Sequence, residues 1–455
     1  MVLEDAVTAT DLALSTRAEP RWGRLRSSPG KAVGCGAILV ASPLVLAYLW
    51  MSCAAYRCAL SGPLVDVLVT RTRTLTDLVA ALPRPTAAGF AIFGAWVALQ
   101  AVLALLLPGR LGFGGITPAG HRMTYRLNGL SAGLVTLGLL ALAVVAGLVP
   151  ATLLHDHWGA LLVAANAWGF AAAFFAYVKA HRWWSRPEDR HLSGSRLCDF
   201  FGGIELNPRV GGLDLKLFHI GRLGMLAWPL VNLSFAAAQY ARHGQVTNSM
   251  VILNALQLLY VLDLFAREDW YLRTIDIHHD RFGFYFAWGA TAWLPFFYPV
   301  QSFYLVQNPV ELSAGAAAGV LALGLAGYAI FVSANRQRDR FRQAEGRCRV
   351  WGREATFIEA SYRTLDGALR RSPLLASGWW GLARHANYVG DLMMAAAFGL
   401  ACGVGHLLPY LYVAYLAVLL VHRTYRDDER CREKYGPAWV EYCARVKYRL
   451  IPGIW

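Results

Sequence analysis

Long apolar stretches recur along the chain and constrain its fold more than any other feature. Their lengths of roughly 18 to 25 residues match what an α-helix needs to cross ~30 Å of hydrocarbon. The composition agrees, because 56% of the 455 residues are hydrophobic, 16% are charged and the mean hydropathy is +0.38. The sequence therefore predicts an all-α, polytopic membrane protein with about ten transmembrane helices, at 32–52, 86–108, 127–150, 159–178, 223–241, 249–266, 284–306, 314–333 and, as a hairpin, 391–421.

The distribution of Lys and Arg predicts how these spans are oriented. The formal net charge is +14, but the basic residues lie in short segments between apolar spans, so no nucleic-acid partner is expected. Residues 151–158 and 307–313 contain no Lys or Arg, whereas five other segments are basic: 109–126, 179–222, 267–283, 334–390 and 422–455. This alternation predicts that both termini are cytoplasmic, with residues 1–31 as a short cytoplasmic tail and 32–455 as the membrane domain.

The segment from Cys53 to Pro85 departs from that alternation. It should lie on the outer side of the membrane, yet it contains several arginines. Two interpretations stay open, an external loop or a loop that includes an amphipathic or re-entrant piece.

The spacing of cysteines and histidines does not support a disulfide framework or a metal site. The eight cysteines include no Cys-x-x-Cys pair, and several lie in or beside apolar segments. The adjacent His278 and His279 would diverge on a helix, and neither this pair nor His155-Asp-His157 has a third ligand at a metal-binding spacing. We therefore expect no bound metal.

Two polar clusters remain as candidates for chemistry. If the helix at 314–333 continues, Arg338 and Arg342 share a face suited to a phosphate, unless they only enforce topology. On the span 249–266, Tyr260 and Asp263 lie three residues apart. An ionisable residue at membrane depth is costly unless it faces a polar interior, so Asp263 is either functional or simply the ion-pair partner of Arg267.

The hairpin 391–421 lies between two polar, aromatic-rich motifs whose charged residues should meet at one membrane surface. In the second motif, Leu420-Val-His-Arg-x-x-Arg-Asp-x-x-x-Cys-x-x-Lys-Tyr-Gly436 resembles the C-terminal signature of the sterol reductases that saturate a C7 or C14 double bond with NADPH. Gly202-Gly-Ile-Glu-Leu-Asn-Pro-Arg209 resembles another signature of that family. The two motifs also occur in the family's order.

The resemblance implies that NADPH binds among the C-terminal helices, about 334–455. The chain has no strand followed by Gly-x-Gly-x-x-Gly and a helix, so no Rossmann domain is expected. Arginines suit phosphates, an aromatic residue suits a flat ring, and amide or carboxylate groups suit ribose or the nicotinamide amide. The implied cofactor contacts are Arg338, Arg342, Leu375, Trp380, Asn387, Arg423, Asp427 and Tyr435. Taken alone, Trp380 would rather be an interfacial aromatic.

Sterol reduction by this family requires a proton donor as well as a hydride donor. Protonation of a Δ5,7-diene at C8 gives an allylic cation, which hydride transfer to C7 then saturates. We predict Tyr260 as the acid, with Tyr442 and Asp427 in its hydrogen-bonded relay. A tyrosine hydroxyl is uncharged at neutral pH and can lie beside an apolar substrate.

Local stretches favour the C7-reducing branch of the family. They are Cys58–Asp66, Trp270–Asp276, Phe286–Gly289 and Leu450–Trp455. The alternatives are reduction of the Δ14 bond, a membrane methyltransferase of the isoprenylcysteine type suggested by Arg384-His-x-x-Tyr-x-Gly390, and a sterol-binding protein without catalysis. The expected partners are a sterol and the lipid bilayer, in the endoplasmic reticulum of a eukaryote or the inner membrane of a bacterium.

Overall fold

The computed structural model describes residues 27–455. The predicted tail 1–31 therefore lies almost entirely outside the described residues. The first described helix, α2 (Pro29–Tyr56), starts where the Ser28 side chain accepts a hydrogen bond from the backbone nitrogen of Lys31. Pro29 takes the first helical position, where the missing N–H costs nothing.

Six helices of the described residues are long and apolar enough to cross a membrane. Each coincides with a span predicted from the sequence: α2, α5 (Ala87–Leu106), α8 (Trp158–Arg182), the continuous segment Leu215–His243, α12 (Asn248–Ala266) and α18 (Ala314–Gln343). Leu215–His243 joins α10 (Leu215–Leu217), the π-helical η3 (Phe218–Met225) and α11 (Ala227–His243). The apolar α6 (Gly129–Val145) is shorter, with 17 residues.

The count of about ten spans is not confirmed, because the remaining predicted spans are short, broken or partly charged. The segment 284–306 is divided into α15 (Phe284–Trp288), the π-helical η4 (Gly289–Trp293), α16 (Leu294–Phe297) and α17 (Val300–Gln307). Pro299 lies at the last break, and a proline cannot continue the hydrogen bonding of a helix. In the hairpin, α20 (Ala386–Ala401) has 16 residues, while α21 (Leu411–Tyr435) is apolar only in its first half.

Short helices connect these elements, and the strands form only two-stranded antiparallel pairs, which the all-α prediction did not include. The short helical segments are α3 (Gly62–Leu64), η1 (Val65–Val69), α4 (Leu75–Ala80), α7 (Leu153–Asp156), η2 (Pro187–Asp189), α9 (Arg196–Gly202), α13 (Glu268–Tyr271), α14 (Ile275–His278), α19 (Trp379–Leu382), η5 (Leu408–Tyr410) and α22 (Pro437–Arg445). The pairs are β1 (Arg110–Ile116) with β2 (Arg122–Leu127), β3 (Arg209–Val210) with β4 (Leu213–Asp214), β5 (Arg349–Val350) with β6 (Arg353–Glu354), β7 (Phe357–Ile358) with β10 (Leu374–Leu375), and β8 (Ser361–Arg363) with β9 (Leu369–Arg371). Residues 27–455 thus contain no parallel sheet of the Rossmann type.

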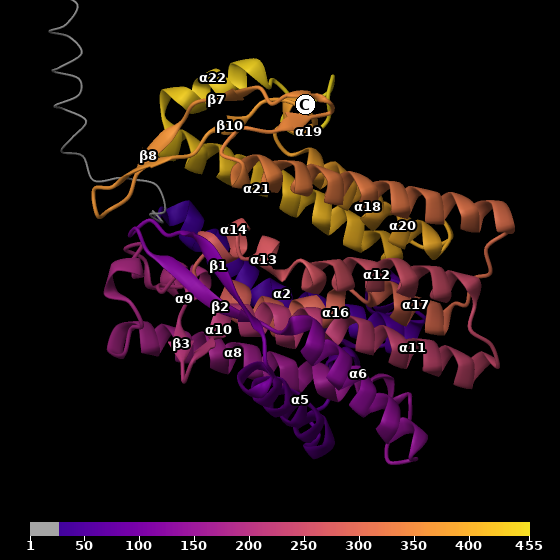
Figure 1. Ribbon diagram of the computed structural model, residues 1–455. Coiled ribbons are helices and arrows are strands. Elements are labelled where there is room, and N and C mark those ends of the chain that lie inside the picture. Colours follow the sequence, from indigo (N-terminus) through magenta and orange to yellow (C-terminus); the bar gives the residue numbers. More distant parts are fainter. Residues whose placement is uncertain (1–26) are drawn as a thin grey trace, which may run out of the picture.

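The helices α18, α20 and α21 form one layer of the molecule, with α22, β7 and β10 at one end of it (Figure 1). Glycines let α18 and α20 approach closely, since a Cβ at Gly390 would lie 2.5 Å from the carbonyl oxygen of Gly327. Beneath this layer lie α11, α12 and α17, and α13, α14 and β1 lie beneath α21 (Figure 1). The α13–α14 region is therefore at the junction of the two layers.

The Asn-Pro-Arg motif has a structural role at this junction. Glu205 of the motif forms a buried ion pair with Lys179, with 2.8 Å between Oε2 and Nζ. Its backbone oxygen accepts a hydrogen bond from the nitrogen of Phe282 at 3.0 Å. Gly203 has a φ of +89°, and a Cβ there would lie 2.4 Å from the carbonyl carbon of Phe282. Glycine at 203 therefore allows the motif to hold the chain between α14 and α15.

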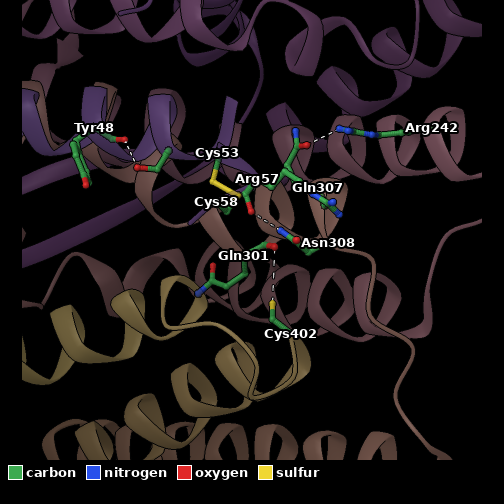
Figure 2. Close-up of a disulfide and its surroundings, with 10 residues drawn as sticks. Tyr48, Cys53, Arg57, Cys58, Arg242, Gln301, Gln307, Asn308 and Cys402 are labelled. Carbon is green, nitrogen blue, oxygen red and sulfur yellow. Dashed lines mark hydrogen bonds between the residues drawn. A yellow bond between two sulfur atoms is a disulfide. The ribbon is translucent and has the colours of Figure 1, made fainter. Parts of the chain in front are cut away.

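One disulfide corrects the expectation drawn from cysteine spacing. Cys53 and Cys58 are joined at the end of α2 (Figure 2), while the other six cysteines are free. The turn that ends α2 brings the two sulfur atoms together, because Arg57 adopts a left-handed conformation with φ 50°. The backbone oxygen of Arg57 accepts a hydrogen bond from Asn308 at 2.9 Å. The disulfide thus secures a loop that contacts the end of α17, and the segment 53–85 contains no helix long enough to span.

Candidate cofactor and sterol site

The two ends of the α20–α21 hairpin meet through charged contacts. Nε2 of His385 lies 3.3 Å from an oxygen of Asp427, and Arg384 pairs with Asp428 at 3.6 Å. Arg430, one turn further along α21, also pairs with Asp427. The prediction that the two motifs meet at one end of the hairpin is confirmed.

Asp427 is held as a carboxylate by this arrangement. Burial alone would raise its pKa, but the charge of Arg430 and the contact with His385 outweigh burial and hold the pKa well below its usual range. At neutral pH the Asp427 carboxylate is therefore ionised, and it can accept hydrogen bonds.

Trp380 is at the centre of a second group of predicted cofactor residues. The guanidinium of Arg338 lies over its ring, 4.2 Å from the ring centre. Its indole nitrogen donates a hydrogen bond to the backbone oxygen of Ala334 at 2.8 Å. Leu375 packs in the same apolar cluster. The helix α18 continues unbroken to Gln343, so Arg342 lies one turn beyond Arg338 on the same face.

Two tyrosines and a lysine complete the polar layer beside α22. The Tyr442 hydroxyl donates a hydrogen bond to the backbone oxygen of Trp380 at 3.2 Å, and burial raises its pKa above the usual range. The Tyr435 hydroxyl lies 3.2 Å from the hydroxyl of Ser372. Lys434 is buried, and burial together with the charge of Arg430 lowers its pKa to about 7. The two tyrosine hydroxyls form hydrogen bonds without a charge. Lys434 gains or loses its charge near neutral pH.

Arg423 links the C-terminal layer to the layer beneath it. Its guanidinium pairs with Asp276 of α14, and both side chains are mostly buried. Tyr388 on α20 and Tyr285 on α15 lie in its surroundings. Arg423 is thus the point at which predicted cofactor residues approach the membrane core.

Tyr260 lies on the other side of Arg423, among aromatic rings of the core. Its ring centre is 6.1 Å from Trp228 and 6.1 Å from Phe331. Asp391 of α20 and Arg423 of α21 are charged groups in its surroundings. Tyr260 is only partly buried, although these elements surround it.

The other two candidates for proton transfer, Asp427 and Tyr442, lie in different clusters. Asp427 belongs to the cofactor cluster described above, whereas Tyr442 packs against Trp439 in the cluster beside α22. No hydrogen bond or ring contact among residues 27–455 joins Tyr442 to Tyr260. A direct relay between these two tyrosines is therefore not present in this structure.

Asp263 has structural partners that account for its position at membrane depth. One oxygen accepts a hydrogen bond from the hydroxyl of Tyr328 at 2.7 Å. The same carboxylate forms an ion pair with Arg267, one turn further along α12. Of the two interpretations that the sequence left open, ion pairing with Arg267 is the one observed, and the hydrogen bond from Tyr328 fastens α12 to α18.

The residues at this site fit a dinucleotide. The guanidinium groups of Arg338, Arg342 and Arg423 suit phosphate groups. The side-chain oxygen of Asn387 is buried and has no hydrogen-bond partner among the described residues. An unpaired buried acceptor is costly, and a ligand amide or hydroxyl would satisfy it. In the described part of the chain, no group of three or more His, Cys, Asp or Glu side chains could hold a metal ion.

Sequence reasoning missed several partners of the predicted site residues. The sequence places Asp276 only in the local stretch Trp270–Asp276, and it assigns no role to Arg430 or Lys434. The spacing of Arg423, Arg426 and Arg430 in α21 was the available signal, because residues three and four apart lie on one helix face. The sequence does not show that the turn at residues 275–280 packs against this face of α21.

Comparison with known proteins covers nearly the whole chain. The profile of the Ergosterol biosynthesis ERG4/ERG24 family matches residues 26–455. The chain is 45% identical to a 7-dehydrocholesterol reductase of Danio rerio over 448 residues, which are 95% of this chain and 94% of the relative. The values for the 7-dehydrocholesterol reductase of Xenopus laevis are the same, 45%, 95% and 94%. A Delta(14)-sterol reductase of Methylotuvimicrobium alcaliphilum is 39% identical over 92% of this chain and 94% of its own length.

These matches agree with the two sequence signatures and with the meeting of the C-terminal motifs at His385 and Asp427. The chain therefore belongs to the ERG4/ERG24 family of sterol reductases.

Proposed function

We propose that the protein is an NADPH-dependent reductase that saturates the C7–C8 double bond of Δ5,7-sterols, of the type that converts 7-dehydrocholesterol to cholesterol. The similarity to two 7-dehydrocholesterol reductases along 95% of the chain carries this proposal. The similarity extends over both layers of the molecule, and therefore over the proposed sterol site and the proposed cofactor site.

The cofactor side of the proposed site lies in the C-terminal layer. When bound, NADPH supplies the hydride. Arg338, Arg342 and Arg423 hold the phosphates. Trp380 offers a flat aromatic ring, on which the guanidinium of Arg338 is stacked in this structure. The unpaired oxygen of Asn387 accepts a hydrogen bond from the nicotinamide amide or a ribose hydroxyl. Leu375, Asp427 and Tyr435 complete the set.

The sterol side is the aromatic core around Tyr260. The Tyr260 hydroxyl holds the proton that passes to C8 of the diene, and the rings of Trp228 and Phe331 orient the flat substrate. The hydroxyl of Tyr442 returns a proton to the site from the C-terminal layer, and the Asp427 carboxylate accepts hydrogen bonds in that relay. No contact joins Tyr442 to Tyr260 in this structure, so the return path includes intervening water or a small movement.

The protein acts as an integral membrane enzyme with a sterol and the bilayer as its partners. The six long apolar helices among residues 27–455 support a multi-pass arrangement. We place it in the endoplasmic reticulum if the source is eukaryotic and in the inner membrane if the source is bacterial.

Reduction of the Δ14 bond is the second candidate, because one relative at 39% identity is a Delta(14)-sterol reductase. Incubating the purified protein with NADPH and either a Δ5,7-sterol or a Δ8,14-sterol distinguishes the two. We expect turnover of the Δ5,7-sterol, with deuterium from labelled NADPH found at C7. Exclusive turnover of the Δ8,14-sterol would refute the proposal.

A further inference from the structure

Three arginines on one face of α21 contact three polar residues of a single turn. Arg423 pairs with Asp276 and Arg426 pairs with Asp280. Arg430 contacts the ring of His279, in addition to its ion pair with Asp427. The turn that carries these partners is α14 with the two residues that follow it, residues 275–280.

This turn is anchored from behind by buried groups of the lower layer. Nζ of the fully buried Lys216 donates hydrogen bonds to the backbone oxygens of Ile277 at 2.7 Å and Asp280 at 2.6 Å. Nε2 of His278 lies 2.5 Å from the backbone oxygen of Ile116 on β1. A turn held on one side by backbone contacts can hold its carboxylates in fixed positions on the other side.

The ion pair of Arg423 and the ion pair of Arg426 differ in their surroundings. Arg423 is the more buried of the two, with 17% of its side chain exposed against 34% for Arg426, and it is one of the proposed cofactor contacts. Arg426 carries the same charge and pairs with the same turn, but it belongs to no proposed cofactor contact. A long side chain loses considerable freedom when it binds a ligand, and a fixed carboxylate that orients it beforehand reduces that loss.

We propose that Asp276 is a positioning residue for the cofactor: it holds the Arg423 guanidinium in the orientation that receives the dinucleotide, while Asp280 only fastens α21 to the turn. The inference rests on the proposed function. It extends the cofactor site into the lower layer, through a residue that does not belong to the C-terminal half.

The test compares Asp276→Asn with Asp280→Asn in the purified full-length protein. Calorimetry gives the dissociation constant for NADPH without turnover, and steady-state assays give KM for NADPH and for the sterol. We expect Asp276→Asn to weaken NADPH binding about 10- to 100-fold, the size expected for one charged hydrogen bond. KM for the sterol should stay unchanged, and Asp280→Asn should bind NADPH like the unmodified protein. Asp276→Ser provides a second removal of the charge if the asparagine variant does not fold.

Arg423→Ala, alone and combined with Asp276→Asn, separates this inference from the proposed function. If Asp276 acts through Arg423, the double variant binds NADPH no more weakly than Arg423→Ala alone. If Arg423→Ala binds NADPH normally, the proposed cofactor role of Arg423 fails. If Arg423→Ala weakens binding but Asp276→Asn behaves like Asp280→Asn, the positioning role is overturned and the cofactor role stands.

Discussion

Replacing Tyr260 by phenylalanine is the most direct test of the proton donor. The change removes one hydroxyl and keeps the ring, whose neighbours Trp228 and Phe331 lie at 6.1 Å between ring centres. Packing and sterol binding should therefore persist. A positioned general acid contributes roughly 10²- to 10⁴-fold to the rate, so kcat should fall by that factor, or about 3–5 kcal/mol of activation free energy.

The assay needs a control that removes a tyrosine hydroxyl from the same region without touching the proposed acid. Tyr328→Phe is suitable, because this hydroxyl donates to Asp263 at 2.7 Å. Its loss should lower the free energy of unfolding by about 1–3 kcal/mol, since the acceptor is a charged and buried carboxylate. The kcat of this variant should change little.

Product formation is followed by mass spectrometry, together with NADPH consumption, sterol KM and thermal unfolding in the same detergent. A Tyr260→Phe protein that folds normally and retains kcat would refute the assignment. Loss of kcat in Tyr442→Phe, with normal kcat in Tyr260→Phe, would move the proton donor to the layer beside α22.

Three further predictions concern the cofactor layer. Trp380→Ala removes the ring on which a guanidinium is stacked, and NADPH affinity measured by calorimetry should fall roughly 3- to 30-fold. Burial and Arg430 lower the pKa of Lys434 to about 7, and an anion prefers the protonated amine. NADPH affinity should therefore decrease as the pH rises from 7 to 9, by at most about tenfold per pH unit, and Lys434→Met should remove that slope. Gly390→Val introduces a Cβ 2.5 Å from the backbone oxygen of Gly327, so the thermal unfolding temperature should drop, corresponding to about 1–3 kcal/mol of overpacking.

The sequence was sufficient to predict most membrane helices, because their lengths and apolar composition are local properties. It did not predict the break of 284–306 into four pieces, although that segment is apolar throughout. Hydropathy does not distinguish a straight span from a buried, irregular segment, and only packing in the core decides between them. The short strand pairs were missed for a related reason, since pairing of two or three residues depends on the neighbours that hold them.

Some contacts of the candidate site could likewise be predicted from the sequence and others could not. The motifs around the hairpin predicted that His385 and Asp427 would meet, because a hairpin fixes which ends are adjacent. They did not predict the partner of Arg423, since Asp276 is separated from it by 147 residues. The role of Asp263 could not be settled either, because its partner Tyr328 comes from a different helix.

The position of the charged residues explains how one protein can join an apolar substrate to an anionic cofactor. The α21 helix is apolar in its first half and carries Arg423, Asp427 and Arg430 in its second half. Such charges are tolerated where water or ion-pair partners are available, and the turn at residues 275–280 supplies partners from the lower layer. The aromatic core around Tyr260 begins beside this charged region, and Arg423 is one of the charged groups in the surroundings of Tyr260. A sterol held in the core and a dinucleotide held among the arginines would therefore meet at Arg423, and its ion pair with Asp276 connects the two layers at that point.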